Sequence, residues 1–251
     1  MKLILLGTGT TLPQKNRNAA GLLIHILDEY LLFDCGNGIL RQIEQINVDF
    51  TQIRDIFISH LHADHVNDLP VLLKANIMRK ISHQIRIYGP STIIKSLEGW
   101  FKEVYPYLDK VLEIMKVEEI KTEWIERENW KIQAFPVQHG IEAYGFKLIA
   151  EGKTIVYSGD TGYCEELIQM AQNADLLIHE CSYPTEYGHG KGHTTPLEVG
   201  QIAQDANVKQ VILTHFYPVC NGRENEMLED VKKRYNGEVI FGKDLQVFNL
   251  E

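Results

Sequence analysis

Short apolar runs of strand length recur along the chain, and glycine, aspartate, asparagine or histidine separates them. In the first half, this pattern predicts strands within residues 2–10, 21–27, 30–38, 54–60 and 84–90. Apolar residues at helical spacing predict helices within residues 38–46, 68–80 and 91–105. Pro70 is compatible with the first turn of the second helix, and a Ser/Thr cap precedes the third.

The second half of the chain repeats this rhythm. Strands are predicted within residues 130–139, 143–150, 153–160, 174–180, 210–215 and 238–242, and helices within 164–172, 196–206 and 224–235. No linker or low-complexity stretch separates the halves. The pattern therefore predicts one α/β domain over residues 1–251, an αββα sandwich in which two mixed sheets pack face to face with helices outside.

Composition supports a globular, intracellular protein. The 251 residues are 44% hydrophobic and 24% charged, which is enough apolar material for a large core. No apolar run approaches the roughly 20 residues of a membrane span, and residues 1–13 lack a signal-peptide pattern, so we expect a cytoplasmic protein. A net charge of -9 argues against broad nonspecific binding to nucleic acid but does not exclude a phosphate-bearing substrate.

Polar residues that bind metals stand at the ends of five predicted strands. They are Asp34, His60, His139, Asp160 and His215. Because a packed sheet holds strand ends rigidly while the following loops bend, residues far apart in sequence can converge on one edge. In the segment HLHADH, His60 and His62 share one side of an extended stretch, whereas Asp64 and His65 follow in a turn and can face a second metal ion.

This crowding of ionisable groups predicts a metal site. Burying four such residues within six positions unpaired would cost several kcal/mol. Imidazole with carboxylate suits Zn²⁺, with manganese or iron as alternatives, and two ions about 3.5–4 Å apart need a bridging ligand such as Asp160. Asp34 is expected either to cap a turn or to orient residues 60–65, which we call the histidine loop, through hydrogen bonds. Other histidines are expected to be ordinary core or surface residues: His25, His83, His179 and His189.

The ordered motifs resemble the metallo-β-lactamase fold, and in particular the ribonuclease Z branch of phosphodiesterases. The resemblance runs through LLGTGTTLP, FDCGNG, SHLHADHVNDLP, AFPVQHG, SGDTG, LIHECSY, GHTTP and VILTHF. It implies a dinuclear site at one edge of the sandwich. By position, His60, His62 and His139 would bind one metal ion, Asp64, His65 and His215 the second, and Asp160 would bridge the two.

The resemblance also implies a hydrolytic mechanism. A hydroxide formed between two zinc ions would attack the phosphoryl group, Asp64 would help to manage its proton, and His193 would be the general acid, oriented by Glu180. Thr194, Thr195 or backbone N–H groups at the start of the following helix are expected to contact phosphate oxygens. Arg17 and Lys191 are further candidate phosphate contacts, although basic residues in loops are usually just solvated.

Two departures from the ribonuclease Z pattern bear on the substrate. Those enzymes carry a long Gly- and Pro-rich arm that binds tRNA, whereas only residues 147–157 stand in its place here. In addition, residues 216–221 read FYPVCN, where those enzymes usually have a Ser and an Arg-Tyr pair. The expected substrate is therefore a small or short phosphodiester, such as a cyclic nucleotide, a cyclic sugar phosphate or short RNA. The alternatives are a lactone or thioester hydrolase, a tRNA 3'-processing endoribonuclease and a non-catalytic zinc-binding module. A homodimer formed through the apolar residues 71–78 is a further expectation.

Overall fold

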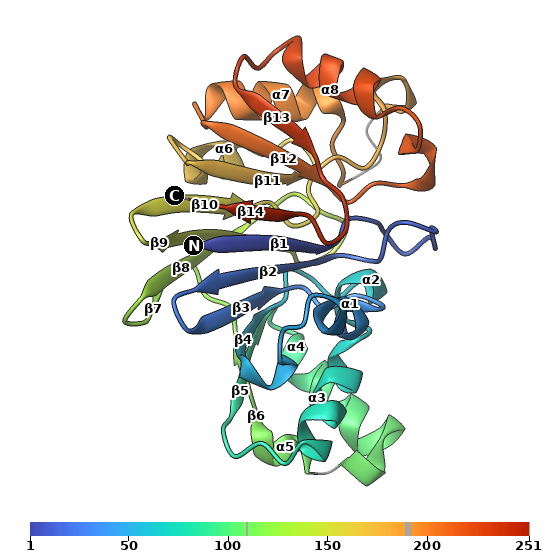
Figure 1. The fold of residues 1–251 in the computed structure, drawn as a ribbon, viewed down its shortest axis with the longest axis vertical. Coiled ribbons are helices and arrows are strands. Elements are labelled where there is room, and N and C mark those ends of the chain that lie inside the picture. Colours follow the sequence, from blue (N-terminus) through green and yellow to red (C-terminus); the bar gives the residue numbers. More distant parts are fainter. Residues whose placement is uncertain (109, 189–191, 251) are drawn as a thin grey trace.

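Two sheets stack face to face in the computed structural model, which describes residues 1–108, 110–188 and 192–250 (Figure 1). In the N-terminal sheet, three antiparallel pairings at one side give way to parallel strands at the other. Its strand order is β14 (Val247–Asn249), β1 (Lys2–Gly7), β2 (Gly21–Ile26), β3 (Glu29–Phe33), β4 (Ile53–Phe57), β5 (Ile85–Gly89) and β6 (Met115–Glu119).

The C-terminal sheet has the same mixed character. Its parallel strands are β13 to β10, and β9 to β7 extend it with antiparallel pairings. The strand order is β13 (Glu238–Phe241), β12 (Gln210–Thr214), β11 (Leu176–Glu180), β10 (Lys153–Tyr157), β9 (Tyr144–Ala150), β8 (Trp130–Pro136) and β7 (Ile125–Glu126). The prediction of two packed mixed sheets is confirmed.

Helices cover the outer face of each sheet, as Figure 1 shows below and above the central layers. The N-terminal sheet carries α1 (Ile39–Gln45), α2 (Ala63–Val66), α3 (Leu69–Met78), α4 (Ile93–Gly99) and α5 (Val111–Ile114). The C-terminal sheet carries α6 (Glu165–Met170), α7 (Pro196–Asp205) and α8 (Glu224–Lys232). The helix predicted within residues 91–105 changes to a π-turn at Trp100–Val104.

Alternation along the strands divides the apolar side chains among three layers. In β1, Leu3 and Leu5 face the opposite sheet, whereas Ile4 and Leu6 pack under the N-terminal helices. Between the sheets, aromatic rings are closely packed; the rings of Phe33 in β3 and Phe146 in β9 lie 5.5 Å apart, centroid to centroid. This middle layer holds the two sheets in a fixed relation, which is what a site built from both sheets requires.

The strands missing from the sequence prediction lie at sheet edges, and the short helix α5 was not predicted either. β6, β7 and β14 are short or carry many exposed positions, so they show little of the apolar alternation that marks a buried strand. The turn expected around Asp64 and His65 is instead the single-turn helix α2.

Helix α3 bears on two expectations. The side chains of Val71 and Met78 in this helix are 52% and 70% exposed, as a contact between two copies of the chain would require. The homodimer itself stays a prediction. Among the described residues, no helix combines the length and the apolar character needed to cross a membrane.

Gly36 allows the histidine loop to approach the β3 end closely. A methyl group at Gly36 would collide with the carbonyl oxygen of Asp64 and lie 2.8 Å from the Cβ of Ala19. We predict that Gly36→Ala lowers the free energy of unfolding by about 1–3 kcal/mol, measured by urea denaturation. Gly99→Ala is the control, since nothing lies within 4 Å of a Cβ there. Equal stability of the two variants would contradict this packing.

Candidate metal centre

The metal-ligating residues that follow the strands of both sheets meet at one edge of the sandwich. Asp34 and His215 come directly after β3 and β12, and His60 follows β4 after two more residues. His139 and Asp160 stand at the same distance after β8 and β10. The strands thus deliver side chains that are up to 181 positions apart in the sequence to a common point.

One group of donors consists of three histidines and an aspartate. The ligand atoms of His60, His62, His139 and Asp160 all lie within 4.8 Å of one another. His62 Nδ1 lies 3.0 Å from His60 Nε2 and 3.1 Å from His139 Nε2. These are the residues expected around the first metal ion.

A second group stands beside the first. The ligand atoms of Asp64, His65 and His215 also lie within 4.8 Å of one another, and the two imidazole Nε2 atoms are 3.4 Å apart. Asp160 Oδ2 lies 3.2 Å from His215 Nε2, 3.4 Å from His65 Nε2 and 3.7 Å from His60 Nε2. The Asp160 carboxylate therefore faces both groups, as a bridging ligand would.

The chemistry of these donors fits divalent cations. Burial lowers the pKa of His60 well below its ordinary value, so the ring is neutral and offers a lone pair. Burial alone would raise the pKa of Asp160, but the neighbouring His215 and His65 outweigh it and keep that pKa well below its usual range. Nitrogen and carboxylate donors in this combination suit Zn²⁺, Mn²⁺ or Fe²⁺. The clustered donors thus have the composition of a divalent-metal site.

Asp34 anchors the histidine loop from beneath. Its carboxylate accepts hydrogen bonds from Ser59 N–H (2.7 Å), Ser59 Oγ–H (2.9 Å) and Tyr157 Oη–H (2.8 Å). His65 Nδ1 lies 2.8 Å from the same carboxylate. When Nδ1 carries the proton toward Asp34, Nε2 is left with its lone pair facing the metal site.

Three of these strand ends turn through left-handed backbone conformations. Asp34 (φ +58°) and His215 (φ +60°) are in the left-handed region, and Gly159 (φ +58°) turns the chain just before Asp160. A non-glycine residue in a sparsely populated conformation costs on the order of 1–3 kcal/mol and persists where its surroundings hold it. The turns redirect the chain at the point where each side chain enters the site.

Glu180 and His193 are paired as expected, and the structure adds Ser182. His193 Nδ1 lies 3.1 Å from Glu180 Oε1, and Ser182 Oγ–H donates to Glu180 Oε2 (2.8 Å). Ser182 Oγ is also 3.0 Å from His215 Nδ1, so the serine connects Glu180 to a candidate metal ligand. Nothing in the sequence marks this serine except its position two residues after Glu180.

The hydroxyl groups of the two expected phosphate contacts are already engaged. Thr194 Oγ1–H donates to the Glu180 carbonyl (3.0 Å), and Thr195 Oγ1–H donates to Glu198 (2.8 Å) at the start of α7. Their contact with substrate stays a prediction. Arg17 is half-buried and packs against Phe216, so it is not a freely solvated loop residue. Lys191 and His189 lie outside the described residues.

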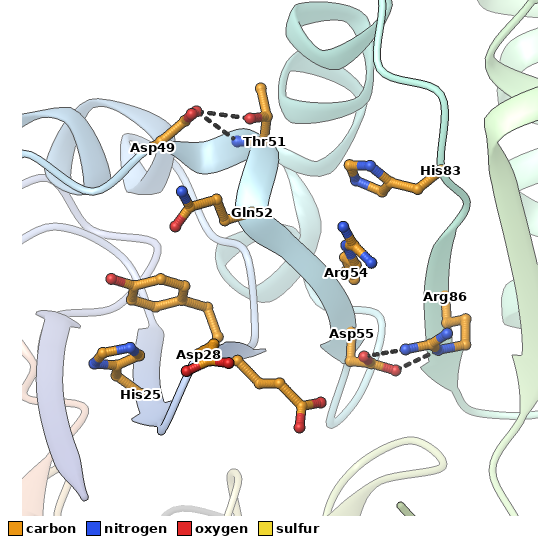
Figure 2. Close-up of a pocket in the computed structure, with 11 residues that line it drawn as sticks. His25, Asp28, Asp49, Thr51, Gln52, Arg54, Asp55, His83 and Arg86 are labelled. Carbon is orange, nitrogen blue, oxygen red and sulfur yellow. Dashed lines mark hydrogen bonds and ion pairs between the residues drawn. The ribbon is translucent and has the colours of Figure 1, made fainter.

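A hollow of about 700 Å³ lies at the opposite edge of the N-terminal sheet, and Figure 2 shows its lining. It contains His25, stacked on Tyr30 with ring centroids 4.3 Å apart, together with His83 and Arg54. An ion pair between Arg86 and Asp55 closes one side, as the dashed lines in Figure 2 show. This hollow is separate from the metal centre, because it lies where the parallel strands begin rather than where they end.

Comparison with known proteins agrees with this architecture. Ribonuclease Z of Methanosarcina mazei is 28% identical over 297 aligned positions, which cover 98% of this chain and 96% of the relative. The metallo-beta-lactamase fold protein YhfI from Bacillus subtilis superposes with a TM-score of 0.87 at 26% identity, over 99% of both chains. The short form of human tRNase Z superposes with a TM-score of 0.80 at 25% identity, over 100% of both chains.

The fold and these relatives define a metallo-β-lactamase-fold hydrolase that is metal-dependent and related to ribonuclease Z. More particularly, a family profile described as anti-Pycsar protein Apyc1 matches residues 1–234, and the chain belongs to that family. The sequence relatives are named ribonuclease Z, and these names support a ribonuclease Z-like activity more than the hydrolysis of small phosphodiesters.

Metal removal tests the site as a whole. Because ions that bind only the folded chain stabilise it by mass action, we predict that Zn²⁺ at about 100 times its Kd adds about 2.7 kcal/mol per bound ion to the free energy of unfolding. A chelator should reverse this gain, and Asp160→Ala should largely abolish it. Differential scanning calorimetry with and without chelator measures both effects. A zinc-dependent gain of full size in Asp160→Ala would contradict the bridging position.

Proposed function

We propose that the protein is a dinuclear metal-dependent phosphodiesterase that hydrolyses a small or short phosphodiester, with cyclic nucleotides as the first candidates. The observation that carries this proposal is the position of Asp160 between two groups of histidine and aspartate ligands. Zinc is the first choice of metal for these donors, and manganese or iron can take the same ligands. The relation to ribonuclease Z supports a phosphodiester over a lactone or thioester.

Paired metal ions, when bound, supply a nucleophile at neutral pH and neutralise charge on the phosphoryl oxygens. His60, His62 and His139 would hold one ion, and Asp64, His65 and His215 the other.

His193 is suited to protonating the leaving oxygen. Burial lowers its pKa, but the hydrogen bond and charge of Glu180 more than offset this, so the pKa of His193 is raised, which favours the protonated ring that a general acid needs. Glu180 thus both orients the proposed general acid and favours its charged form.

A two-residue turn supports a small substrate. Strands β9 and β10 pair in register up to Ala150 and Lys153, so only Glu151 and Gly152 stand where ribonuclease Z enzymes carry their tRNA-binding arm. The alignment with the Methanosarcina relative also has more positions (297) than this chain has residues (251), so the relative carries segments that this chain lacks.

Two tyrosines give the site an aromatic rim. Tyr183 and Tyr217 are stacked with centroids 4.6 Å apart, both are half-buried, and each ring centroid lies 6.0 Å from that of His193. Planar rings beside a phosphodiester-cleaving centre suit a nucleobase, because bases stack on aromatic side chains regardless of sequence. This supports a nucleotide over a sugar phosphate that has no base.

Processing of the tRNA 3' end is the second candidate, and the names of the relatives favour it. It requires the chain to hold folded tRNA without the arm and with a net charge of -9. A direct comparison of substrates separates the candidates.

For catalysis, we predict that zinc- or manganese-loaded protein hydrolyses bis(p-nitrophenyl) phosphate and that Asp160→Ala lowers kcat/KM on the order of 100-fold or more. Asp28→Ala, an exposed turn residue at the opposite edge, is the control and should keep full activity. If the metal-loaded protein instead cleaves only lactones or thioesters, the phosphodiesterase proposal is wrong.

For specificity, we predict faster turnover of cyclic nucleotides than of precursor tRNA by the wild-type protein. Tyr217→Ala should raise KM for a cyclic nucleotide roughly 10-fold, because stacking on one aromatic ring contributes about 1–3 kcal/mol per base. The same variant should leave KM unchanged for methyl riboside cyclic phosphate, which has no base. Efficient tRNA cleavage with weak turnover of cyclic nucleotides would favour the second candidate.

A further inference from the structure

Phe216 is held on both of its backbone polar groups by a distant loop. Its N–H donates to the carbonyl of Thr8 (2.8 Å), and its carbonyl accepts from Gln14 Nε2 (2.8 Å). Phe216 directly follows His215, whose backbone is left-handed (φ +60°). The loop after β1 therefore controls the chain direction at a candidate metal ligand more than 200 positions away in the sequence.

Arg17 locks this loop against Phe216. Its guanidinium carbon lies 4.6 Å from the centroid of the Phe216 ring, which in turn stacks on Phe241 at 3.9 Å. Arg17 Nη1–H donates to Thr8 Oγ1 (2.5 Å) and to the Gly242 carbonyl (3.0 Å). The planar guanidinium thus uses its face for the phenyl ring and its edge for hydrogen bonds, which a lysine cannot do.

Asp244 completes the arrangement from the C-terminal end of the chain. Its carboxylate accepts from Thr8 N–H (2.9 Å), Thr8 Oγ1–H (2.7 Å) and Asn18 N–H (2.6 Å), and from Gln42 Nε2 (3.1 Å). Thr8 itself is fully buried. Its hydroxyl donates to Asp244 and accepts from Arg17, so it connects the two charged groups.

We propose that Arg17, acting through Thr8 and Phe216, is a positioning residue that holds His215 in its left-handed conformation and so sets the affinity for the second metal ion. We name Arg17, Thr8 and Asp244 the Arg17 clamp. The described contacts of Arg17 run to Thr8, Gly242 and Phe216, which gives it a role separate from the predicted phosphate contact. This inference rests on the proposed metal site and adds a residue that acts on a candidate ligand only through its neighbours.

Cobalt titration tests the clamp without relying on activity. Visible spectra of wild-type protein, with a competing chelator, should resolve two Co²⁺ equivalents, and His215→Ala identifies the one that depends on His215. Arg17→Ala should weaken that equivalent on the order of 10-fold and leave the other unchanged, an effect of the size that outer groups have on metal affinity. Added methylguanidinium should restore the affinity, and Arg54→Ala, an exposed arginine at the opposite edge, should match wild type.

If Arg17→Ala does not fold, a second variant can test the same proposal. Thr8→Val removes the hydroxyl that joins Arg17 to Asp244 while keeping its shape, and it should weaken the same Co²⁺ equivalent. Loss of thermal stability with both Co²⁺ affinities unchanged would overturn the positioning role. A wild-type chain that takes up fewer than two equivalents would overturn the proposed dinuclear site as well, so the two failures are distinguishable.

Discussion

The structure depends on holding a cluster of imidazole and carboxylate groups together at the edge between two sheets. Asp160 lies within 4 Å of imidazole nitrogens from three histidines, and most of these side chains are buried. Such groups would be solvated better in water than next to one another, so the packed core must impose their arrangement. The aromatic layer between the sheets imposes it, because this layer fixes the position of one sheet relative to the other and each sheet carries some of the candidate ligands.

Contacts outside the ligand cluster then set the direction of the His65 and His215 imidazoles. Asp34 is 2.8 Å from His65 Nδ1, and Ser182 is 3.0 Å from His215 Nδ1. Each contact directs one ring nitrogen away from the centre and leaves the other toward it. The left-handed turns at Asp34 and His215 serve the same end, because they aim the side chain that follows a strand across the edge of the sheet. We therefore expect metal affinity to depend on residues beyond the candidate ligands.

Much of the fold and many of the candidate ligands could be predicted from the sequence, for a physical reason. A buried strand that ends in a polar residue has two signals at once, apolar alternation and an ionisable end, and the segments ending near His60, Asp160 and His215 show both. Ser182 shows neither, since a single serine hydroxyl is common everywhere and acts here only through its neighbours. The sequence singled out Arg17 only as a candidate phosphate contact, because its partners Phe216 and Asp244 are close to it only in the folded chain. The edge strands β6 and β14 are short and bury few of their residues, and so leave almost no pattern.

The measurement that tests the central claim most directly is a crystal structure with data collected on both sides of the zinc absorption edge. Two anomalous peaks about 3.5–4 Å apart, on either side of the Asp160 carboxylate, are the predicted result. One of them should be surrounded by His60, His62 and His139, and the other by Asp64, His65 and His215. A zinc-soaked crystal with no peak beside Asp160, or with its peaks in the hollow around His25 and His83, would contradict the account.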